Sequence, residues 1–319
     1  MSKVSFIIPI GPGLKPDVCV DSLRKLDHPK KDFEVVVAEG RSPSAQRNQA
    51  VEAADGEIVF FLDDDVIVEP DLLDHVLPYY EDPDVAIVGG PMVTPDFDPL
   101  LARCFGYTME SFIGAGSMRY RFRPIGEARE ADETQLVLCN LSARRDAYLK
   151  EGGLRADLFP NEENEFFNRM AGKGYKMIYE PKALVHHSRA KTIASIIKKN
   201  IAYGRGRMEQ VLIQPSCFKP IFLMPTAFTA YLLSMMPVVI GFGSVIYLLP
   251  LLLYLTLTGL ASLKTALDKR EFMILPAMWL LYPVIHVSYG LGFVYGLVRK
   301  YLKKDVDMDS AIDVRKVVL

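Results

Sequence analysis

The chain has 319 residues, 24% charged and 50% hydrophobic, and its 37 Lys and Arg against 39 Asp and Glu give a formal net charge of -2. Nucleic-acid binders carry a basic excess or a basic stripe, so we expect no nucleic-acid partner. The length allows about two domains of roughly 100–200 residues each. The four cysteines form no C-x-x-C pair, which favours reduced thiols over a disulfide framework. The first apolar run, Val4–Ile10, is too short for a typical secretory signal, so we expect no signal peptide.

The first 190 residues alternate between short apolar runs and helical patterns. Near-continuous apolar runs are typical of central parallel strands, and they occur at Val4–Ile10, Phe33–Ala38, Ile58–Leu62 and Val85–Val88. Helical patterns between or after them span Asp17–Leu26, Pro43–Ala54 and Pro70–Tyr80. This alternation predicts an open α/β sheet that binds its ligand at the carboxyl ends of the strands. Because the chain has neither G-x-G-x-x-G after the first strand nor G-x-x-x-x-G-K-[ST], dinucleotide oxidoreductases and P-loop proteins lose their main support.

Three consecutive carboxylates, Asp63, Asp64 and Asp65, follow the third apolar run. Like charges this close repel one another, and a divalent cation with a preference for oxygen ligands, Mg²⁺ or Mn²⁺, would relieve the repulsion. Alternate strand residues point to opposite faces, so we expect Asp63 and Asp65 to share one site while Asp64 turns away. The alternative is a solvated acidic loop before the helix near Pro70.

The segment Lys191–Gln214 has isoleucines at helical spacing, together with the basic residues Lys198, Lys199, Arg205 and Arg207. This pattern predicts an amphipathic helix at a membrane interface, with its basic face toward anionic groups. The alternative is a soluble helix that docks on the preceding domain.

Two long stretches lack charged side chains. The 44 residues Pro220–Leu263 contain none, which is long enough for two membrane spans of about 20 residues each. The 27 residues Phe272–Val298 also lack Lys, Arg, Asp and Glu, but prolines and glycines such as Pro283 and Gly290 interrupt them. We therefore predict two full spans, a third membrane-embedded segment in the form of a re-entrant or interfacial hairpin, and a cytosolic C-terminus. Three full spans, or a buried helical hairpin in a soluble domain, are the alternatives.

Six segments resemble the family 2 glycosyltransferases in their order and spacing, over roughly residues 3–210: VSFIIPI (4–10), EVVVAEG (34–40), AQRNQAVEAADGEIVFFLDDDV (45–66), CNLSARRDAYLKEGG (139–153), NEENEFFNRM (161–170) and YEPKALVHHS (179–188). The resemblance implies a GT-A fold, an open mixed α/β sheet flanked by helices. It also implies an inverting transferase that takes its sugar from a nucleotide-diphosphate sugar.

The resemblance further implies which residues bind the donor. The residues expected to lie along the nucleotide and its phosphates are Pro9, Ile10, Gly11, Glu39, Arg47, Asp63 and Asp64. Glu39 stands where the family usually has an Asp that contacts the base, and the family's Asp-Asp-Gly-Ser reads Ala-Glu-Gly here. The metal ligands implied for Mg²⁺ or Mn²⁺ are Asp65, Asp63 and His187, with His186 as an adjacent alternative.

The motif NEENEFFNRM implies the catalytic carboxylates. Glu163 falls at the position of the usual Asp base, and Glu162 precedes it. A carboxylate is needed because the acceptor hydroxyl must lose its proton as it attacks the anomeric carbon. An acidic pair at a helix N-terminus also has an ordinary structural explanation, since the helix dipole favours it by about 0.3–1 kcal/mol per charge.

A transferase with membrane segments implies an acceptor that lies in the membrane. We predict transfer of one sugar to a lipid-linked (polyprenyl-phosphate or polyprenyl-diphosphate) saccharide, with Arg169, Arg205 and Arg207 binding acceptor or phosphate and with membrane lipids as further partners. The chain has no Q-x-x-R-W motif of processive synthases. A polyprenyl-phosphate or dolichyl-phosphate hexose synthase is one alternative, and a non-catalytic membrane scaffold is another.

The predicted organisation has four parts. Residues 1–190 form the catalytic domain, 191–217 the interfacial helix, 218–298 a transmembrane region of two or three helices, and 299–319 a C-terminal tail. The predicted location is the cell membrane, with a multi-pass anchor and the catalytic domain on the cytoplasmic face.

Overall fold

The structure, a computed structural model, describes residues 3–242, 244–302 and 312–319. The chain divides into two compact units: the first comprises Met1–Pro95, Tyr120–Ser188 and Asp305–Leu319, and the second comprises Asp96–Arg119 and Arg189–Lys304. The chain thus leaves the first unit close to the predicted boundary at residue 190. It differs from the prediction in two places, because residues 96–119 group with the second unit and the C-terminal residues group with the first.

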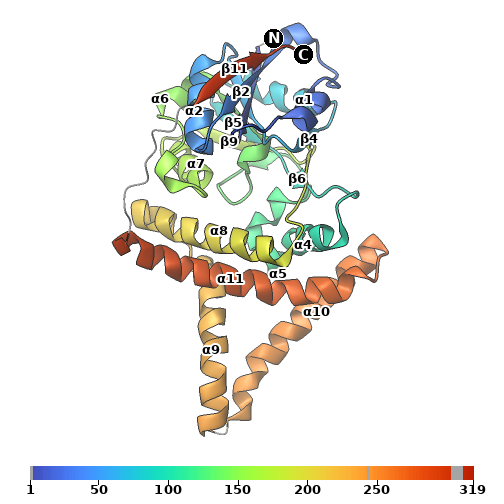
Figure 1. The fold of residues 1–319 in the computed structure, drawn as a ribbon, viewed down its shortest axis with the longest axis vertical. Coiled ribbons are helices and arrows are strands. Elements are labelled where there is room, and N and C mark those ends of the chain that lie inside the picture. The colour runs from blue at the N-terminus through green and yellow to red at the C-terminus, as the bar shows by residue number, and fades with distance from the viewer. Residues whose placement is uncertain (1–2, 243, 303–311) are drawn as a thin grey trace. The chain divides into compact units, whose positions relative to one another are not determined.

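The first unit is built on a mixed sheet, which confirms the predicted fold class (Figure 1). Among the described residues, eight strands form it in the order β11-β2-β1-β3-β8-β5-β9-β7. Neighbours β1 and β2, β1 and β3, and β5 and β9 are parallel, whereas β8, β7 and β11 run antiparallel to their partners. The strands span Val4–Ile10 (β1), Phe33–Glu39 (β2), Ile58–Phe61 (β3), Val85–Gly89 (β5), Arg129–Glu130 (β7), Leu141–Arg144 (β8), Lys176–Tyr179 (β9) and Asp313–Val317 (β11).

Helices cover both faces of this sheet. On one face, side chains of β1 such as Phe6 and Ile8 pack with α1 (Asp17–Leu23) and α3 (Leu72–Val76). On the other face, Ile7 and other strand residues join a core with hydrophobic residues of three helices: α2 (Pro43–Ala53), α6 (Arg145–Lys150) and α7 (Glu162–Gly172). Burial on both faces explains why the central strands read as continuous apolar runs.

The helix predicted over Pro70–Tyr80 is shorter than expected. It begins at Leu72 as α3, ends at Val76 and continues as a 3-10 turn over Leu77–Glu81. Pro78 lies in this turn, and proline cannot donate the backbone hydrogen bond that would continue an α-helix.

A small second sheet lies in the same unit. In the described part of the chain its three strands are β4 (Val66–Val68), β10 (Val185–His187) and β6 (Met92–Val93), with β10 in the middle. The register pairs His187 with Val66, the residue directly after Asp65. This pairing brings two segments far apart in the sequence to the same place.

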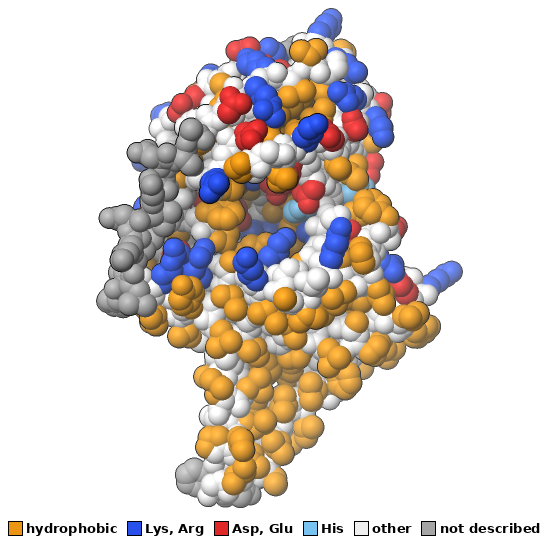
Figure 2. Space-filling model, in the orientation of Figure 1, with side chains coloured by type: hydrophobic (Ala, Val, Ile, Leu, Met, Phe, Trp, Pro, Cys, Tyr) orange, Lys and Arg blue, Asp and Glu red, His pale blue; other side chains and the backbone are white. Residues whose placement is uncertain are grey.

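The second unit is helical. Its long helices are α8 (Ile193–Ile213), α9 (Met224–Phe242), α10 (Leu249–Lys269) and α11 (Ile274–Leu302). The shorter helices α4 (Leu100–Glu110) and α5 (Phe112–Ala115), from earlier in the chain, belong to the same unit. Helices α9 and α10 form a hairpin, and α11 runs along α8 (Figure 1). Three of the described segments are long and apolar enough to cross a membrane: Pro220–Gly241, Val245–Lys269 and Ile274–Arg299. Hydrophobic side chains cover the visible face of the α9–α10 hairpin (Figure 2).

The segment expected to fold as an interrupted hairpin is instead one continuous helix, α11, so this prediction was wrong. Glycines let α11 pack closely on α8: a Cβ at Gly204 would lie 2.1 Å from the Tyr289 carbonyl oxygen, and one at Gly292 would lie 2.2 Å from that of Ile201. In the most apolar stretch of α11, 39% of the residues are buried inside the protein, against 6% and 11% for the stretches of α9 and α10. The glycines therefore act in helix packing and do not break the helix.

Candidate active site

A pocket of about 500 Å³ lies at the carboxyl ends of β1 and β2, where the α/β pattern predicts a ligand. Residues at the end of β1, the start of α2 and the end of β3 line it, including Pro9, Ile10, Gly11, Arg47, Asp63 and Asp64. A second pocket of about 300 Å³ is lined by Pro12, Glu39, Gly40, Ile312 and Asp313. Because Pro12 and Gly40 line both pockets, the two adjoin. The structure thus gathers every residue predicted to bind the donor around one double pocket.

Side chains hold the pocket's walls together. Gln46 on α2 donates to the carbonyl oxygens of Ile10 (2.8 Å) and Ala38 (2.5 Å), and so ties the ends of β1 and β2 to the helix. The backbone N–H of Gly13 donates to Glu39 Oε1 at 2.7 Å, which holds the loop after β1 against the end of β2. Gly13 has φ of 74°, a conformation that glycine adopts without strain.

Arg47 links the pocket to the N-terminus of α7. Its Nη2 donates to Asp63 Oδ1 at 2.6 Å, and its Nη1 lies 3.6 Å from Glu162 Oε1. Arg47 and Glu162 are buried, and burial together with the negative charge of Glu163 raises the pKa of Glu162. The nearby Arg47 charge opposes this rise, because it favours the ionised carboxylate.

Beside this pocket, His187 lies close to each of the predicted carboxylate ligands, Asp65 and Asp63. His187 Nε2 lies 3.2 Å from Asp65 Oδ1. Ligand atoms of Asp63, His187 and Cys139 also lie within 4.8 Å of one another, and Cys139 Sγ is 3.8 Å from His187 Nδ1. Carboxylate oxygens with an imidazole nitrogen suit Mn²⁺ or Mg²⁺, so Asp63, Asp65 and His187 fit the implied cation, whereas the thiol of Cys139 is a soft ligand that neither ion prefers.

Asp64 does not turn away as predicted. Strand β3 ends at Phe61, before the acidic triplet, so strand alternation does not apply to these residues. Asp64 lines the donor pocket together with Asp63. Partial burial and the charges of Asp65 and Asp63 raise the pKa of Asp64, which is the repulsion expected of three adjacent carboxylates.

The first turn of α7 presents the two candidate catalytic carboxylates differently. The Glu162 side chain is 3% exposed, whereas that of Glu163 is 19% exposed. Arg121 lies 3.7 Å from Glu163 and donates to Asn164 Oδ1 at 2.5 Å. Asn161, just before the helix, has φ of 145°, a strained value for an L residue. Such strain is often found at functional sites.

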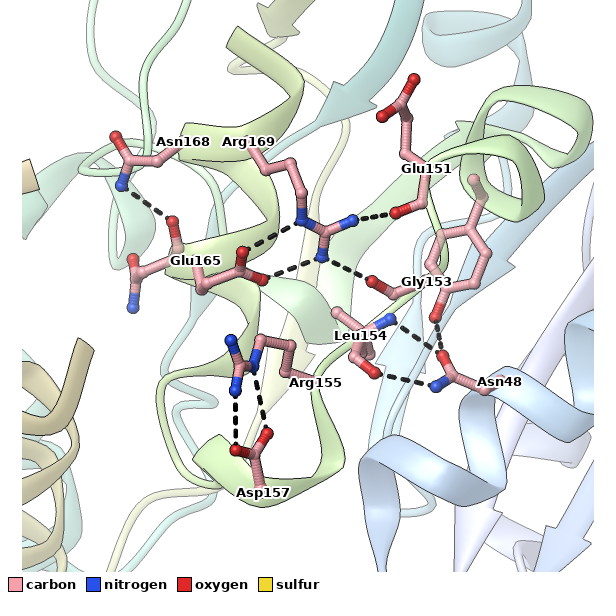
Figure 3. A network of polar contacts seen from close by, with 11 residues as sticks. Asn48, Glu151, Gly153, Leu154, Arg155, Asp157, Glu165, Asn168 and Arg169 are labelled. Atoms are coloured by element: carbon pink, nitrogen blue, oxygen red, sulfur yellow. Dashed lines mark hydrogen bonds and ion pairs between the residues drawn. The ribbon is translucent and has the colours of Figure 1, made fainter. Parts of the chain in front are cut away.

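Arg169, predicted to bind phosphate, has a different set of partners in the structure (Figure 3). Its guanidinium forms a bidentate ion pair with Glu165 (3.0 and 2.8 Å) and donates to the carbonyl oxygens of Gly153 (2.7 Å) and Glu151. Asn48 fixes the same loop by hydrogen bonds to the backbone of Leu154. Arg169 therefore holds the loop before α7, and its role in acceptor or phosphate binding stays a prediction.

Arg205 and Arg207 lie on α8, in the second unit. Glu209 lies 3.9 Å from Arg205 and 2.9 Å from Arg299. Arg207 is 1% exposed and donates to Gln210 at 2.8 Å. A role of either arginine in acceptor binding stays a prediction.

Several residues of the site were not singled out from the sequence. Gln46 and Asn48 flank Arg47 in the A-Q-R-N segment, so this motif could have indicated both residues. Cys139 opens the C-N-L-S segment, but its approach to His187 depends on how distant strands pair, which the sequence does not reveal. Arg121 lies outside all of the recognised segments.

Comparison with known proteins agrees with this geometry. Residues 15–103 match the model of glycosyl transferase family 2. Over these residues the chain resembles that family. It is 26% identical over 194 residues to a pre-mycofactocin glycosyltransferase of Mycobacterium tuberculosis (strain ATCC 25618 / H37Rv), a match that covers 60% of this chain and 40% of that protein.

A second relative is the glucosyl-dolichyl phosphate glucuronosyltransferase of Haloferax volcanii, 31% identical over 116 residues, which are 36% of this chain and 35% of that protein. The chain thus spans two-fifths or less of these relatives' length. A solved structure, the mannosyltransferase PcManGT from Pyrobaculum calidifontis in complex with GDP-Man and Mn²⁺, superposes with a TM-score of 0.62 at 17% identity. It covers 94% of this chain and 88% of that one. This likeness confirms the GT-A fold.

Proposed function

We propose that the chain is a membrane-bound, metal-dependent, inverting glycosyltransferase that moves one sugar from a nucleotide-diphosphate sugar to a lipid-linked saccharide. The observation that carries this proposal is the Arg47 guanidinium, which joins Asp63 on the donor pocket to Glu162 beside the candidate base. A donor site and a carboxylate for the acceptor thus lie within reach of one side chain.

The double pocket supports the donor part of the proposal. The carboxylates after β3 and the buried guanidinium of Arg47 on α2 are suited to a metal-bound diphosphate. The adjoining pocket beside Glu39 is available for the base. Asp63, Asp65 and His187 would hold Mg²⁺ or Mn²⁺, which when bound neutralises charge on the leaving diphosphate. The solved neighbour's complex with GDP-Man and Mn²⁺ agrees with this assignment.

Glu163 is the better candidate for the general base. Its carboxylate is partly exposed, whereas that of Glu162 is buried against Arg47. Glu163 would accept the proton of the acceptor hydroxyl as that oxygen attacks the anomeric carbon. A single displacement with one base inverts the anomeric configuration. Glu162 would hold Arg47 in place.

The two-unit organisation supports a specific membrane topology. The chain leaves the first unit after Ser188 and returns to it at β11, which pairs with β2 in the same sheet. An odd number of crossings would put these two strands on opposite sides of the membrane, so we infer an even number of crossings. We assign the crossings to α9 and α10, and we propose that α11 lies at the membrane–water interface together with α8. The donor pocket then faces the cytosol, where nucleotide sugars are made.

A lipid-linked acceptor follows from this anchorage. The Haloferax relative's name refers to glucosyl-dolichyl phosphate, a lipid-linked sugar, in agreement with that class of acceptor. The experiment is a screen of purified full-length protein in nanodiscs. Nucleoside diphosphate release from a panel of nucleotide sugars is measured with Mn²⁺ or chelator, with and without extracted membrane lipids. We expect metal-dependent release that increases with one lipid fraction. Absence of nucleoside diphosphate release from every nucleotide sugar, with and without Mn²⁺ and lipid, would refute the proposal.

A further inference from the structure

The C-terminal strand returns to the edge of the catalytic sheet next to the donor pocket. Strand β11 pairs antiparallel with β2, and the register places Asp313 opposite Glu39 and Val317 opposite Val35 (Figure 1). Glu39 is the last residue of β2, at the end of the strand where the pocket opens. Residues that follow the membrane helices in the sequence thus reach the part of the site assigned to the nucleobase.

Residues at the start of this segment form part of the pocket wall. Ile312 and Asp313 line the smaller pocket together with Glu39 and Gly40. Gly40 and Ile312 are in close contact, since a Cβ at Gly40 would lie 3.2 Å from Ile312 Cγ1. One wall therefore carries an apolar side chain next to carboxylates, a combination suited to a flat base with N–H groups on its edge.

Arg315 acts on the carboxylate of Glu39. Its Nη1 lies 3.4 Å from Glu39 Oε2, while Glu39 Oε1 accepts a hydrogen bond from the Gly13 N–H at 2.7 Å. Partners on both oxygens fix the direction of this carboxylate, and its side chain remains 27% exposed. An ionised carboxylate has about four lone-pair sites, so each oxygen can still accept a further hydrogen bond.

We propose that β11 is part of the donor site, with Arg315 as a positioning residue that holds Glu39 to accept an N–H of the nucleobase and Ile312 as a contact for the base. This inference rests on the proposed function and names the element that sets the donor's base specificity.

A purely structural role for β11 makes a different prediction, and the neighbouring residue supplies a control. Lys316 lies 2.8 Å from Glu34 and 2.8 Å from Asp55, away from the pocket residues. Arg315→Ala and Lys316→Ala each remove one cation and at least one ion pair from the same strand. If β11 only closes the sheet edge, the two variants should behave alike.

The test measures dissociation constants of full-length protein in nanodiscs by calorimetry with Mn²⁺. The ligands are GDP, UDP, ADP, CDP and inorganic pyrophosphate, which lacks a base. We expect Arg315→Ala to weaken the preferred nucleoside diphosphate about tenfold, within the range of one hydrogen bond to a charged group. Pyrophosphate affinity should change less than about twofold, Arg315→Lys should restore part of the preference, and Lys316→Ala should match wild type. Ile312→Ala should weaken the preferred nucleotide without affecting pyrophosphate.

Each other outcome overturns the inference. Unchanged base preference in Arg315→Ala, an equal loss in Lys316→Ala, or an equal loss for pyrophosphate would assign β11 a structural role only and leave the proposed function intact. A wild-type protein that binds nucleoside diphosphates without base preference would also exclude it. A wild type that binds none would overturn the proposed function together with this inference.

Discussion

Arg47 donates a hydrogen bond to Asp63 at 2.6 Å from within α2, where its side chain is 6% exposed. The same guanidinium lies 3.6 Å from the buried carboxylate of Glu162. One cation therefore compensates two acids on different segments, one on the donor pocket and one at the start of α7. Desolvated charges of this kind are costly unless paired, so the three side chains act as a unit.

We expect Arg47→Met to destabilise the protein as well as to weaken donor binding. Methionine replaces the aliphatic part of the arginine side chain but leaves Glu162 buried without its cation. Loss of one partner from a buried ion pair lowers the free energy of unfolding by about 3–5 kcal/mol. Thermal unfolding of the purified protein measures this effect. Arg155→Met is the matched control, because the Arg155–Asp157 pair is 42% exposed on both sides and should contribute about 0–1 kcal/mol. Equal shifts of Tm in the two variants would contradict a special role for Arg47.

Asp65→Asn should weaken nucleoside diphosphate binding only when Mn²⁺ is present. An amide is a poorer ligand than a carboxylate for a hard cation, and Asp65 lies 3.2 Å from the predicted ligand His187. Titration of nucleoside diphosphate affinity against Mn²⁺ concentration measures the change. Asp71→Asn, which removes a carboxylate of 56% exposure that pairs with His75, is the control and should keep the wild-type curve. A wild-type Mn²⁺ dependence in Asp65→Asn would remove this residue from the metal site.

The sequence was most informative where burial dictates the pattern. The central strands could be predicted from apolar runs because both faces of the sheet are covered. The position of the donor pocket could be predicted because residues such as Pro9 and Glu39 lie at the carboxyl ends of these strands. It was least informative where distant segments meet. The contact of Cys139 with His187 depends on how β10 pairs with β4 and β6. Strand β11 has a short, mostly polar sequence, D-V-R-K-V, that carries little strand signal by itself.

Two sequence expectations failed for local reasons. The alternation rule was applied to Asp64 beyond the end of its strand at Phe61. Glycines of the last apolar segment suggested a broken helix, whereas they allow α8 and α11 to approach closely. Arg169 shows a different limit of sequence analysis. The motif singled out this residue but did not reveal that its guanidinium N–H groups bind Glu165 and the carbonyl oxygen of Gly153.

Glu163→Gln should slow sugar transfer by about 10²-fold or more while leaving the donor dissociation constant unchanged, because only the proton acceptor is lost. Glu162→Gln should behave differently and change donor affinity through Arg47, its neighbour at 3.6 Å. Single-turnover transfer rates and donor titrations on both variants separate the two effects. If Glu163→Gln transfers at the wild-type rate, the acceptor nucleophile needs no base. That result would favour a lipid phosphate as acceptor, since its oxygen is already ionised, and hence a polyprenyl-phosphate hexose synthase.

The last prediction concerns the two ends of the membrane region. If α9 and α10 are the crossings, the turn between them and the C-terminal strand lie on opposite sides of the membrane. Val245, at the turn, is 68% exposed and Val318, just after β11, is 92% exposed, so a cysteine at either position is accessible from its own side. The four native cysteines are buried and give a low labelling background. In intact cells a membrane-impermeant thiol reagent should label Val245→Cys and leave Val318→Cys unlabelled until the membrane is permeabilised. Rapid labelling of both Val245→Cys and Val318→Cys in intact cells would establish an odd number of crossings. That outcome is incompatible with the pairing of β11 and β2 in one cytosolic sheet, and it would also remove the C-terminal strand from the donor site.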